Sequence, residues 1–238
     1  MESIKGKNIL VVGATGGVGS RAAKLLAGGG ATVFITGRNT IKLQEVGAGI
    51  NIPLDHQFTM DISSATDVEQ TTNAIHAMIP AVDIVVIASG IGIIKTMDAL
   101  TAEEFIQTIH TNLVGPFLLI KALLPKMKEQ KKGLIINIPG VLGKVPMAGA
   151  AAYSASKYGL TGMMQSIREE IKRTEIRITN LFLGGVDSPF WDNIDLRVQR
   201  DKMIEAEEAA KAIWFLCQQP RSGVVSEMVL QPFNHQAI

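Results

Sequence analysis

The chain of 238 residues has few of the features that mark secreted, membrane or nucleic-acid-binding proteins. It has one cysteine, Cys217, so no disulfide can form within it. Its 23 basic and 22 acidic residues nearly cancel, which gives no reason to expect nucleic acid or an anionic membrane as a partner. The longest apolar stretch, residues 81–94, contains Asp83 and two glycines and is too short to span a bilayer.

Targeting signals, metal-ligand patterns and domain boundaries are also absent from the sequence. Residues 1–7 have no signal-peptide pattern, so we expect a cytoplasmic protein. The four histidines do not have the spacing of metal ligands, so we expect no metal site; they are His56, His76, His110 and His235. No repeat, linker or shift in composition divides the chain. We therefore expect a single domain over residues 1–238, since roughly 200–250 residues is usual for one layered α/β domain.

Short apolar runs alternate with helical segments along the whole chain. Residues 8–12 form a mostly apolar run between a lysine and a glycine, which is typical of a strand buried on both faces. Further strands are expected at 32–36, 58–60, 82–88, 134–138, 176–183 and 224–230, and helices at 21–27, 67–79, 101–128, 151–173 and 205–219. Within residues 101–128, Pro116 should bend or interrupt the helix. The alternation predicts a doubly wound, Rossmann-like parallel sheet of about seven strands with helices on both faces.

A glycine-rich turn, Gly13-Ala-Thr-Gly-Gly-Val-Gly19, joins the first strand to the following helix. Glycines at 13, 17 and 19 allow a sharp bend and a close approach to a pyrophosphate, and the helix N-terminus supplies free N–H groups. The alternative is that they only let the helix pack closely on the strand. The position directly after a buried strand favours a dinucleotide site, with Val18 and Thr15 also in the turn.

The end of the second strand reads Thr36-Gly37-Arg38-Asn39. Enzymes that choose NAD usually place a carboxylate near this point for the ribose 2′-hydroxyl, and none stands here. An arginine pairs well with a 2′-phosphate, and Thr15 offers a hydroxyl to the same group. We therefore predict NADP (NADPH) as the cofactor. The alternative is that Arg38 is only a solvated surface residue.

Tyr153 and Lys157 stand one helical turn apart in Ala-Ala-Tyr-Ser-Ala-Ser-Lys. An ammonium group beside a phenol favours the phenolate, so we expect Lys157 to lower the pKa of Tyr153. A tyrosine with a lowered pKa is a usable proton donor or acceptor. An ordinary exposed helix pair is the alternative, and the glycine turn upstream makes it the weaker one.

With these motifs in this order, nearly the whole chain resembles the short-chain dehydrogenase/reductase family. The resemblance implies that Asn112 belongs to the catalytic network with Tyr153 and Lys157. It also implies further cofactor contacts, namely Asp61 and Ile62 at the adenine, Ala88 and Gly90 beside the ribose, Val186 and Ser188 at the nicotinamide carboxamide, and Tyr153 and Lys157 themselves. Ile87-Ala88-Ser89-Gly90 keeps only the glycine of the family's Asn-Asn-Ala-Gly. A homodimer or homotetramer is implied as well.

The largest departure from the family pattern is at the catalytic serine. The family places this serine about thirteen residues before the tyrosine, and here Gly140 occupies the position. The serine hydroxyl normally donates a hydrogen bond to the substrate oxygen as that oxygen becomes negative. Losing such a donor costs about 2.7–4 kcal/mol of transition-state stabilisation. The alternatives are that Ser89 or a hydroxyl group of the substrate compensates for the missing serine hydroxyl.

The sequence therefore predicts an NADP-dependent oxidoreductase that interconverts a ketone or aldehyde and an alcohol, with Tyr153 as proton donor or acceptor. The alternative is a cofactor-binding sensor or scaffold protein with impaired catalysis. An apolar pocket for a small carbonyl or alcohol substrate is expected from residues after the strand ends; these are Ile91, Ile93, Met97, Leu142, Val145, Met147, Phe190 and Trp191. We expect Asp187, Asp192 and Asp195 to be solvated.

Overall fold

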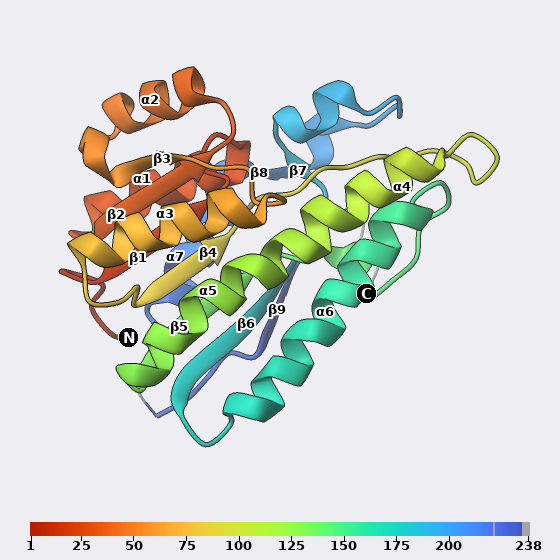
Figure 1. The fold of residues 1–238 in the computed structure, drawn as a ribbon. Helices are drawn as coiled ribbons and strands as arrows, with labels where there is room; N and C mark the ends of the chain where they lie inside the picture. The colour runs from red at the N-terminus through yellow and green to blue at the C-terminus, as the bar shows by residue number, and fades with distance from the viewer. Residues whose placement is uncertain (221, 235–238) are drawn as a thin grey trace.

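A seven-stranded parallel sheet forms the centre of the protein in the computed structural model, which describes residues 1–220 and 222–234 (Figure 1). The strand order is β3-β2-β1-β4-β5-β6-β9. The strands are β1 (Asn8–Val12), β2 (Thr32–Gly37), β3 (Gln57–Thr59), β4 (Ile84–Ile87), β5 (Lys132–Asn137), β6 (Glu175–Leu183) and β9 (Glu227–Leu230). Because strand order reverses between β1 and β4, the chain forms the doubly wound sheet expected from the sequence.

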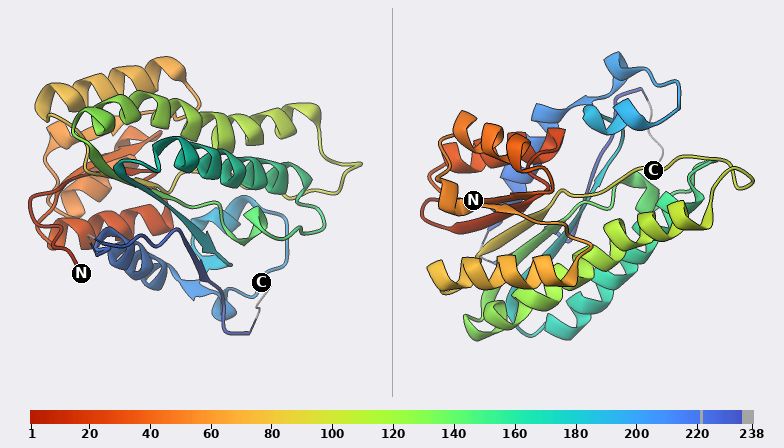
Figure 2. Two further views of the ribbon diagram at one scale, coloured as in Figure 1. Left: turned by 90° about the horizontal axis from the view of Figure 1, so that it is seen from below. Right: turned by 45° about the horizontal axis from the view of Figure 1, so that its top comes forward.

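Helices cover both faces of the sheet (Figure 2). On one face, α1 (Gly17–Gly28), α2 (Thr40–Gly49) and α7 (Ala206–Cys217) pack on one apolar cluster. On the other face, α3 (Ala65–Met78), α5 (Gly115–Glu129) and α6 (Ala151–Ile171) pack on a second cluster. The central strands are buried on both sides, which explains why they are apolar without alternation.

The expected helix over residues 101–128 is interrupted before Pro116. It consists of α4 (Ala102–Ile109), a π-helical turn η2 (His110–Val114) and then α5. Pro116 is the second residue of α5, so a residue without an N–H stands directly after the π turn, where the hydrogen-bond pattern of the helix changes. The capping box of Thr101 and Glu104 begins α4 as the sequence indicates. The π turn places Asn112 on the inner side of the helix, where it is 1% exposed.

Several other elements differ from the sequence prediction, among them an additional helix and the start of the last strand. Helix α2 was not expected, because two glycines weaken the helical pattern at its end. Asn39 begins this helix by accepting a hydrogen bond from the Lys42 N–H. The last strand starts at Glu227 rather than at residue 224. Neither difference changes the topology.

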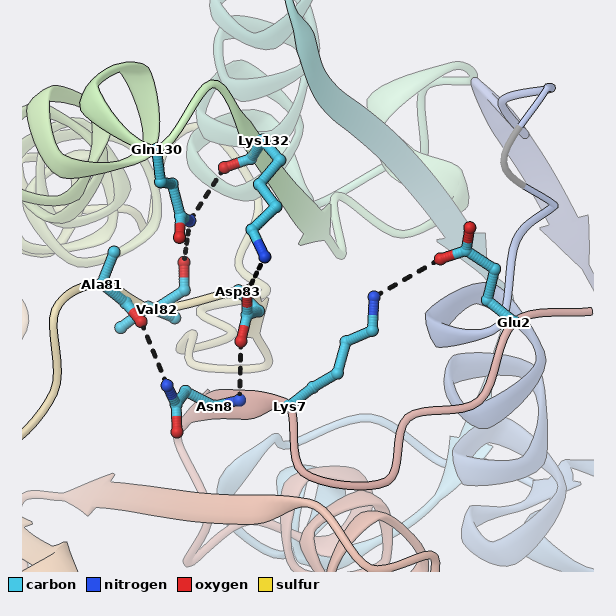
Figure 3. Close-up of polar contacts among 8 residues, drawn as sticks. All are labelled: Glu2, Lys7, Asn8, Ala81, Val82, Asp83, Gln130 and Lys132. Atoms are coloured by element: carbon cyan, nitrogen blue, oxygen red, sulfur yellow. Dashed lines mark hydrogen bonds and ion pairs between the residues drawn. The ribbon is translucent and has the colours of Figure 1, made fainter.

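Polar side chains join the strands at the amino end of the sheet (Figure 3). The carboxylate of Asp83 accepts from the Asn8 N–H at 2.9 Å and lies 3.5 Å from the Lys132 ammonium. Gln130 donates to the carbonyls of Val82 and Lys132. These contacts fix β1, β4 and β5 at one end, which leaves the loops at the carboxyl end to form the site.

The described residues contain no helix with the length and apolar character needed to cross a bilayer. Within the same residues, no group of three or more His, Cys, Asp or Glu side chains is arranged to hold a metal ion. His235 lies outside the described residues.

Candidate active site

A cavity of about 1070 Å³ lies at the carboxyl ends of the strands. It contains most of the residues that the sequence singles out: Gly13, Thr15, Gly17, Val18, Arg38, Ile62, Ala88, Gly90, Tyr153, Lys157, Val186 and Ser188. Gly19, Asn39, Asp61 and Asn112 do not line it. Motifs more than a hundred residues apart in sequence therefore meet in one site.

Close approaches of the backbone explain the glycines of the turn between β1 and α1. Gly13 has a φ of +85°, and a Cβ there would lie 2.7 Å from the Ser89 nitrogen. A Cβ at Gly17 would lie 2.6 Å from the Ser188 Cβ, so the loop after β6 rests on the turn. A Cβ at Gly19 would meet the Gly13 carbonyl at 2.3 Å, so this glycine packs α1 on its own turn. Gly13 and Gly17 thus keep a narrow cradle open to the cavity.

Arg38 and Thr15 lie together at the end of β2. A Cβ at Gly37 would be 2.7 Å from Thr15 Cγ2 and 3.1 Å from Thr15 Oγ1, so the Thr15 side chain rests against Gly37. Asn39 instead caps α2. The Asp61 carboxylate accepts from the Ser63 N–H and hydroxyl, which ties it to its own turn. Arg38 and Thr15 both line the cavity, so both are available to a phosphate here.

Tyr153 and Lys157 face each other from the first turns of α6. The Lys157 Nζ lies 5.4 Å from the centre of the Tyr153 ring and donates to the Ile138 carbonyl at 3.2 Å. Lys157 is 3% exposed, and burial lowers its pKa to about 8.

The expectation that Lys157 lowers the pKa of Tyr153 is wrong for this structure. Burial raises the pKa of Tyr153 to about 12. Lys157 is buried and Tyr153 is half-buried, so loss of water favours the neutral form of each, and this effect outweighs the attraction between ammonium and phenolate. Tyr153 is therefore a protonated phenol near neutral pH, which suits it to donate a proton.

Asn112 acts on the site through hydrogen bonds rather than by facing the cavity. Its side chain accepts from the Ile91 N–H and donates to the Ile91 carbonyl, each at 2.9 Å. It also donates to the Ser156 hydroxyl at 3.1 Å, and Ser156 donates to the Tyr153 carbonyl at 2.7 Å. A Cβ at Gly90 would lie 3.2 Å from Asn112 Oδ1 and 3.5 Å from Lys157 Nζ. Asn112 thus holds the loop after β4 against the helix that carries Tyr153.

A family model for short chain dehydrogenases matches residues 7–199 of the chain. The chain belongs to the short-chain dehydrogenase family. This is a family of oxidoreductases that bind a nicotinamide cofactor. The match covers the glycine turn, the Tyr153–Lys157 pair and the sheet as far as the loop after β6.

Individual relatives match nearly end to end. An uncharacterized oxidoreductase of Staphylococcus epidermidis is 29% identical over 98% of this chain and 100% of its own. The 3-oxoacyl-[acyl-carrier-protein] reductase of Rickettsia felis is 30% identical over 96% of both chains. A metagenomic short-chain oxidoreductase, solved in complex with NADP, is 29% identical with a TM-score of 0.83 over 97% of this chain and 99% of its own.

Gly140 has a backbone conformation that differs from that of an ordinary serine. Its φ is +71° and its ψ is 169°, a region that almost only glycine adopts. A Cβ built there would lie 3.4 Å from the Leu183 carbonyl, which is an ordinary contact. Space therefore exists for a side chain, and backbone strain is what opposes one.

Substitution of Gly140 by serine is expected to lower the free energy of unfolding by about 1–3 kcal/mol without raising turnover. The serine would add a hydroxyl but would strain the backbone at this positive φ. If the backbone relaxed to relieve the strain, the hydroxyl would no longer lie at the position of the family's serine. Gly140→Ala should be equally destabilising, because the strain comes from the Cβ. Chemical denaturation measures both variants beside Gly162→Ser, a control at an exposed helix position with no atom within 4 Å of the new Cβ. A faster Gly140→Ser enzyme of unchanged stability would contradict this.

The loop after β6 forms a lid over the cavity. It contains β7 (Val186–Asp187), the short helices η4 (Pro189–Asn193) and η5 (Arg200–Lys202), and β8 (Ile204–Glu205). The Phe190 ring packs edge-on against Tyr153, with 5.9 Å between ring centres. A Cβ at Gly92 would lie 2.3 Å from Phe190 Cζ, so the lid packs on the loop after β4 at a point where only glycine leaves room for the Phe190 ring.

Arg200 joins the two ends of the lid through contacts within the lid itself. Its guanidinium contacts Asp187 at 2.7 Å and Asp192 at 2.8 Å, and it donates to the Ser188 carbonyl. Asp187 and Asp192 are exposed, as the sequence suggested, and they are also ion-paired with Arg200. The arrangement was not foreseen because partners thirteen residues apart in irregular chain show no periodic signal.

The expected apolar pocket is formed in part. Its lining includes Leu142, Val145, Met147, Phe190 and Trp191, together with Ile94, which the sequence did not indicate. Ile91, Ile93 and Met97 lie outside the lining, and Met97 is 79% exposed. These apolar side chains line the same cavity as Tyr153, and Phe190 packs against it, so they bound the space that a substrate would occupy.

Proposed function

We propose that this protein is an NADP(H)-dependent oxidoreductase that interconverts a ketone or aldehyde and an alcohol. The observation that carries the proposal is the meeting of Tyr153 and Lys157 with the glycine turn and Arg38 in one cavity. The metagenomic relative that was solved with NADP supports the choice of cofactor.

The residues of this chain divide the work between cofactor and substrate. Gly13 and Gly17 give the pyrophosphate its cradle at the N-terminus of α1, and Arg38 with Thr15 pairs with the 2′-phosphate. When bound, NADPH supplies a hydride to the carbonyl carbon and leaves as NADP.

Tyr153 then gives its phenolic proton to the substrate oxygen as the carbon–oxygen double bond becomes a single bond. Its raised pKa does not prevent this, because the alkoxide it protonates is a stronger base than a phenolate. Lys157, held by the Ile138 carbonyl, binds the nicotinamide ribose and returns the proton to Tyr153. The apolar wall beside Phe190 excludes water from the reacting atoms.

The second candidate function is a cofactor-binding sensor or scaffold, and Gly140 is the observation that favours it. No hydroxyl stands at the family's serine position, which removes one side-chain donor to the substrate oxygen. The two functions separate in one assay, which measures NADPH oxidation against ketones, aldehydes and diketones beside direct NADPH binding. Binding without turnover on every compound would support the sensor.

Cofactor choice provides a direct test of Arg38. NADPH should bind more tightly than NADH by about 1–3 kcal/mol, because a guanidinium–phosphate contact is charge-assisted. Arg38→Ala with Gly37→Asp should reverse the order. A Cβ at Gly37 would crowd Thr15, so the reversal should be larger when Thr15→Ala is added.

The measurement is a fluorescence titration of both cofactors, with Arg173→Ala at an exposed site outside the cavity as the control. Equal affinity of the unmodified protein for NADPH and NADH would contradict the assignment of Arg38.

The expected homodimer or homotetramer stays a prediction. Several large apolar side chains on α4, α5 and α6 are exposed and are available to such an interface, namely Phe105, Ile106, Phe117 and Tyr158.

A further inference from the structure

The charged side chains that line the cavity all have one sign. They are Arg38, Lys157, Arg197 and Lys202, and no aspartate or glutamate of the described residues is among the lining. The whole chain is nearly neutral, so the cationic lining is a local property of the site. A cavity with cations in low-dielectric walls concentrates anionic ligands.

Two of these four cations already have a task under the proposed function. Arg38 stands at the end of β2 for the 2′-phosphate, and Lys157 is beside Tyr153. The pyrophosphate is served by backbone N–H groups at the N-terminus of α1. Arg197 and Lys202 are therefore in excess of what the cofactor requires.

Both remaining cations lie on the lid, where their neighbour Arg200 behaves differently. Arg200 is neutralised by Asp187 and Asp192. Among the described residues, neither Arg197 nor Lys202 forms an ion pair with a carboxylate. The other lid carboxylates, Asp195, Asp201 and Glu205, are exposed and do not line the cavity.

The same lid segment supplies apolar lining. Leu196 and Val198 flank Arg197 in the sequence, and all three line the cavity with Phe190 and Trp191. A ligand under this lid therefore meets Phe190 beside Tyr153, and further apolar side chains and two cations that the same lid contributes. This combination fits an amphipathic molecule with a reactive apolar part and an anionic end.

We propose that Arg197 and Lys202 form an anion subsite that selects carbonyl substrates carrying an anionic group on an apolar chain. The inference rests on the proposed function and names its substrate class. The anionic group is a carboxylate or a phosphate, because guanidinium and ammonium groups bind both kinds of anion. The hydride and proton steps are unchanged, because the subsite contacts the end of the substrate remote from the carbonyl.

Matched substrates test the subsite in the active enzyme. Oxo-carboxylic acids of increasing chain length are compared with their methyl esters and with oxoalkyl phosphates, using NADPH oxidation as the readout. We expect kcat/KM to be about tenfold or more higher for the anions than for the ester of the same length. The preference should weaken as salt is raised, since an exposed cation is screened.

Charge removal without loss of size identifies the residues. Arg197→Gln and Lys202→Gln should each reduce the preference for the anion by about fivefold or more, through KM, and leave the NADPH dissociation constant unchanged. Lys211→Gln, at an exposed site on α7 outside the cavity, is the control and should have no effect. A carboxylate preference without a phosphate preference, or the reverse, identifies which anion is recognised.

A binding measurement keeps the inference testable if no compound turns over. Trp191 lines the cavity, and in a Trp214→Phe background it is the remaining tryptophan. Titration of the NADPH-loaded protein with each acid and its ester then reports binding at the lid. Tighter binding of the acids that is lost in Arg197→Gln supports the subsite, even where turnover fails and the proposed function falls.

Two results would overturn the subsite. The first is equal kcat/KM and equal binding for acids and esters, which would leave the proposed reductase intact. The second is weaker NADPH binding by Arg197→Gln and Lys202→Gln without a change in substrate preference, which would assign these cations to the cofactor.

Discussion

Replacement of Tyr153 by phenylalanine is expected to lower the rate of carbonyl reduction by a factor of about 10²–10⁴. The change removes one oxygen atom and with it the side-chain proton donor that faces the substrate. Because the ring remains, its packing against Phe190 and the affinity for NADPH should be preserved. Single-turnover kinetics with NADPH, beside a cofactor titration, separates the chemical step from binding.

The chain has one other tyrosine, and it provides a matched control. Tyr158 lies on the same helix, is 43% exposed and does not line the cavity. Tyr158→Phe should therefore leave the rate and the affinity unchanged. If Tyr153→Phe turned over as fast as the unmodified protein, another group would have to supply the proton.

Replacement of Lys157 by methionine is expected to abolish most turnover and at the same time to stabilise the fold. Lys157 is buried, and its pKa falls from the ordinary 10.5 to about 8, so the folded state disfavours its charge. At neutral pH the protein nevertheless holds that charge in its interior. Methionine fills similar space without charge, and unfolding should become less favourable by about 1–3 kcal/mol after loss of the hydrogen bond to Ile138.

The sign of the pH dependence follows from the same shift. Between about pH 8 and 10.5 the unfolded chain binds more protons at Lys157 than the folded chain, so this residue makes stability rise with pH. The advantage of Lys157→Met should therefore be greatest below about pH 8 and shrink above it. Reductive turnover of the unmodified protein should fall as pH rises through about 8, where Lys157 loses its proton.

Thermal and denaturant unfolding of the unmodified protein, Lys157→Met and Lys211→Met measure the effect across this pH range. Lys211 is exposed on α7, so its replacement should change stability little. A Lys157→Met protein that is less stable at pH 7 would show that the hydrogen bond to Ile138 outweighs the cost of burying the charge.

The amino-acid sequence by itself determined the fold and the two motifs of the site. Strand and helix periodicity depends on local spacing, and residues 8–12 show it as clearly in the sequence as in β1. The glycine turn is equally local, because the conformation of Gly13 and the start of α1 lie within a few residues of each other. Tyr153 and Lys157 share a helix face for the same reason.

Only the tertiary structure decided how these residues behave. The pKa of Tyr153 rises because the folded chain partly removes it from water, with Phe190 from a distant part of the sequence packed on its ring. Spacing along a helix contains no information on burial. The positive φ of Gly140 is likewise a backbone conformation that the residue type permits but does not require. Arg197 and Lys202 appear in the sequence as two ordinary cations of an irregular segment. They line the cavity because the lid packs back on Gly92 and Gly17, and such contacts join residues that no local pattern connects.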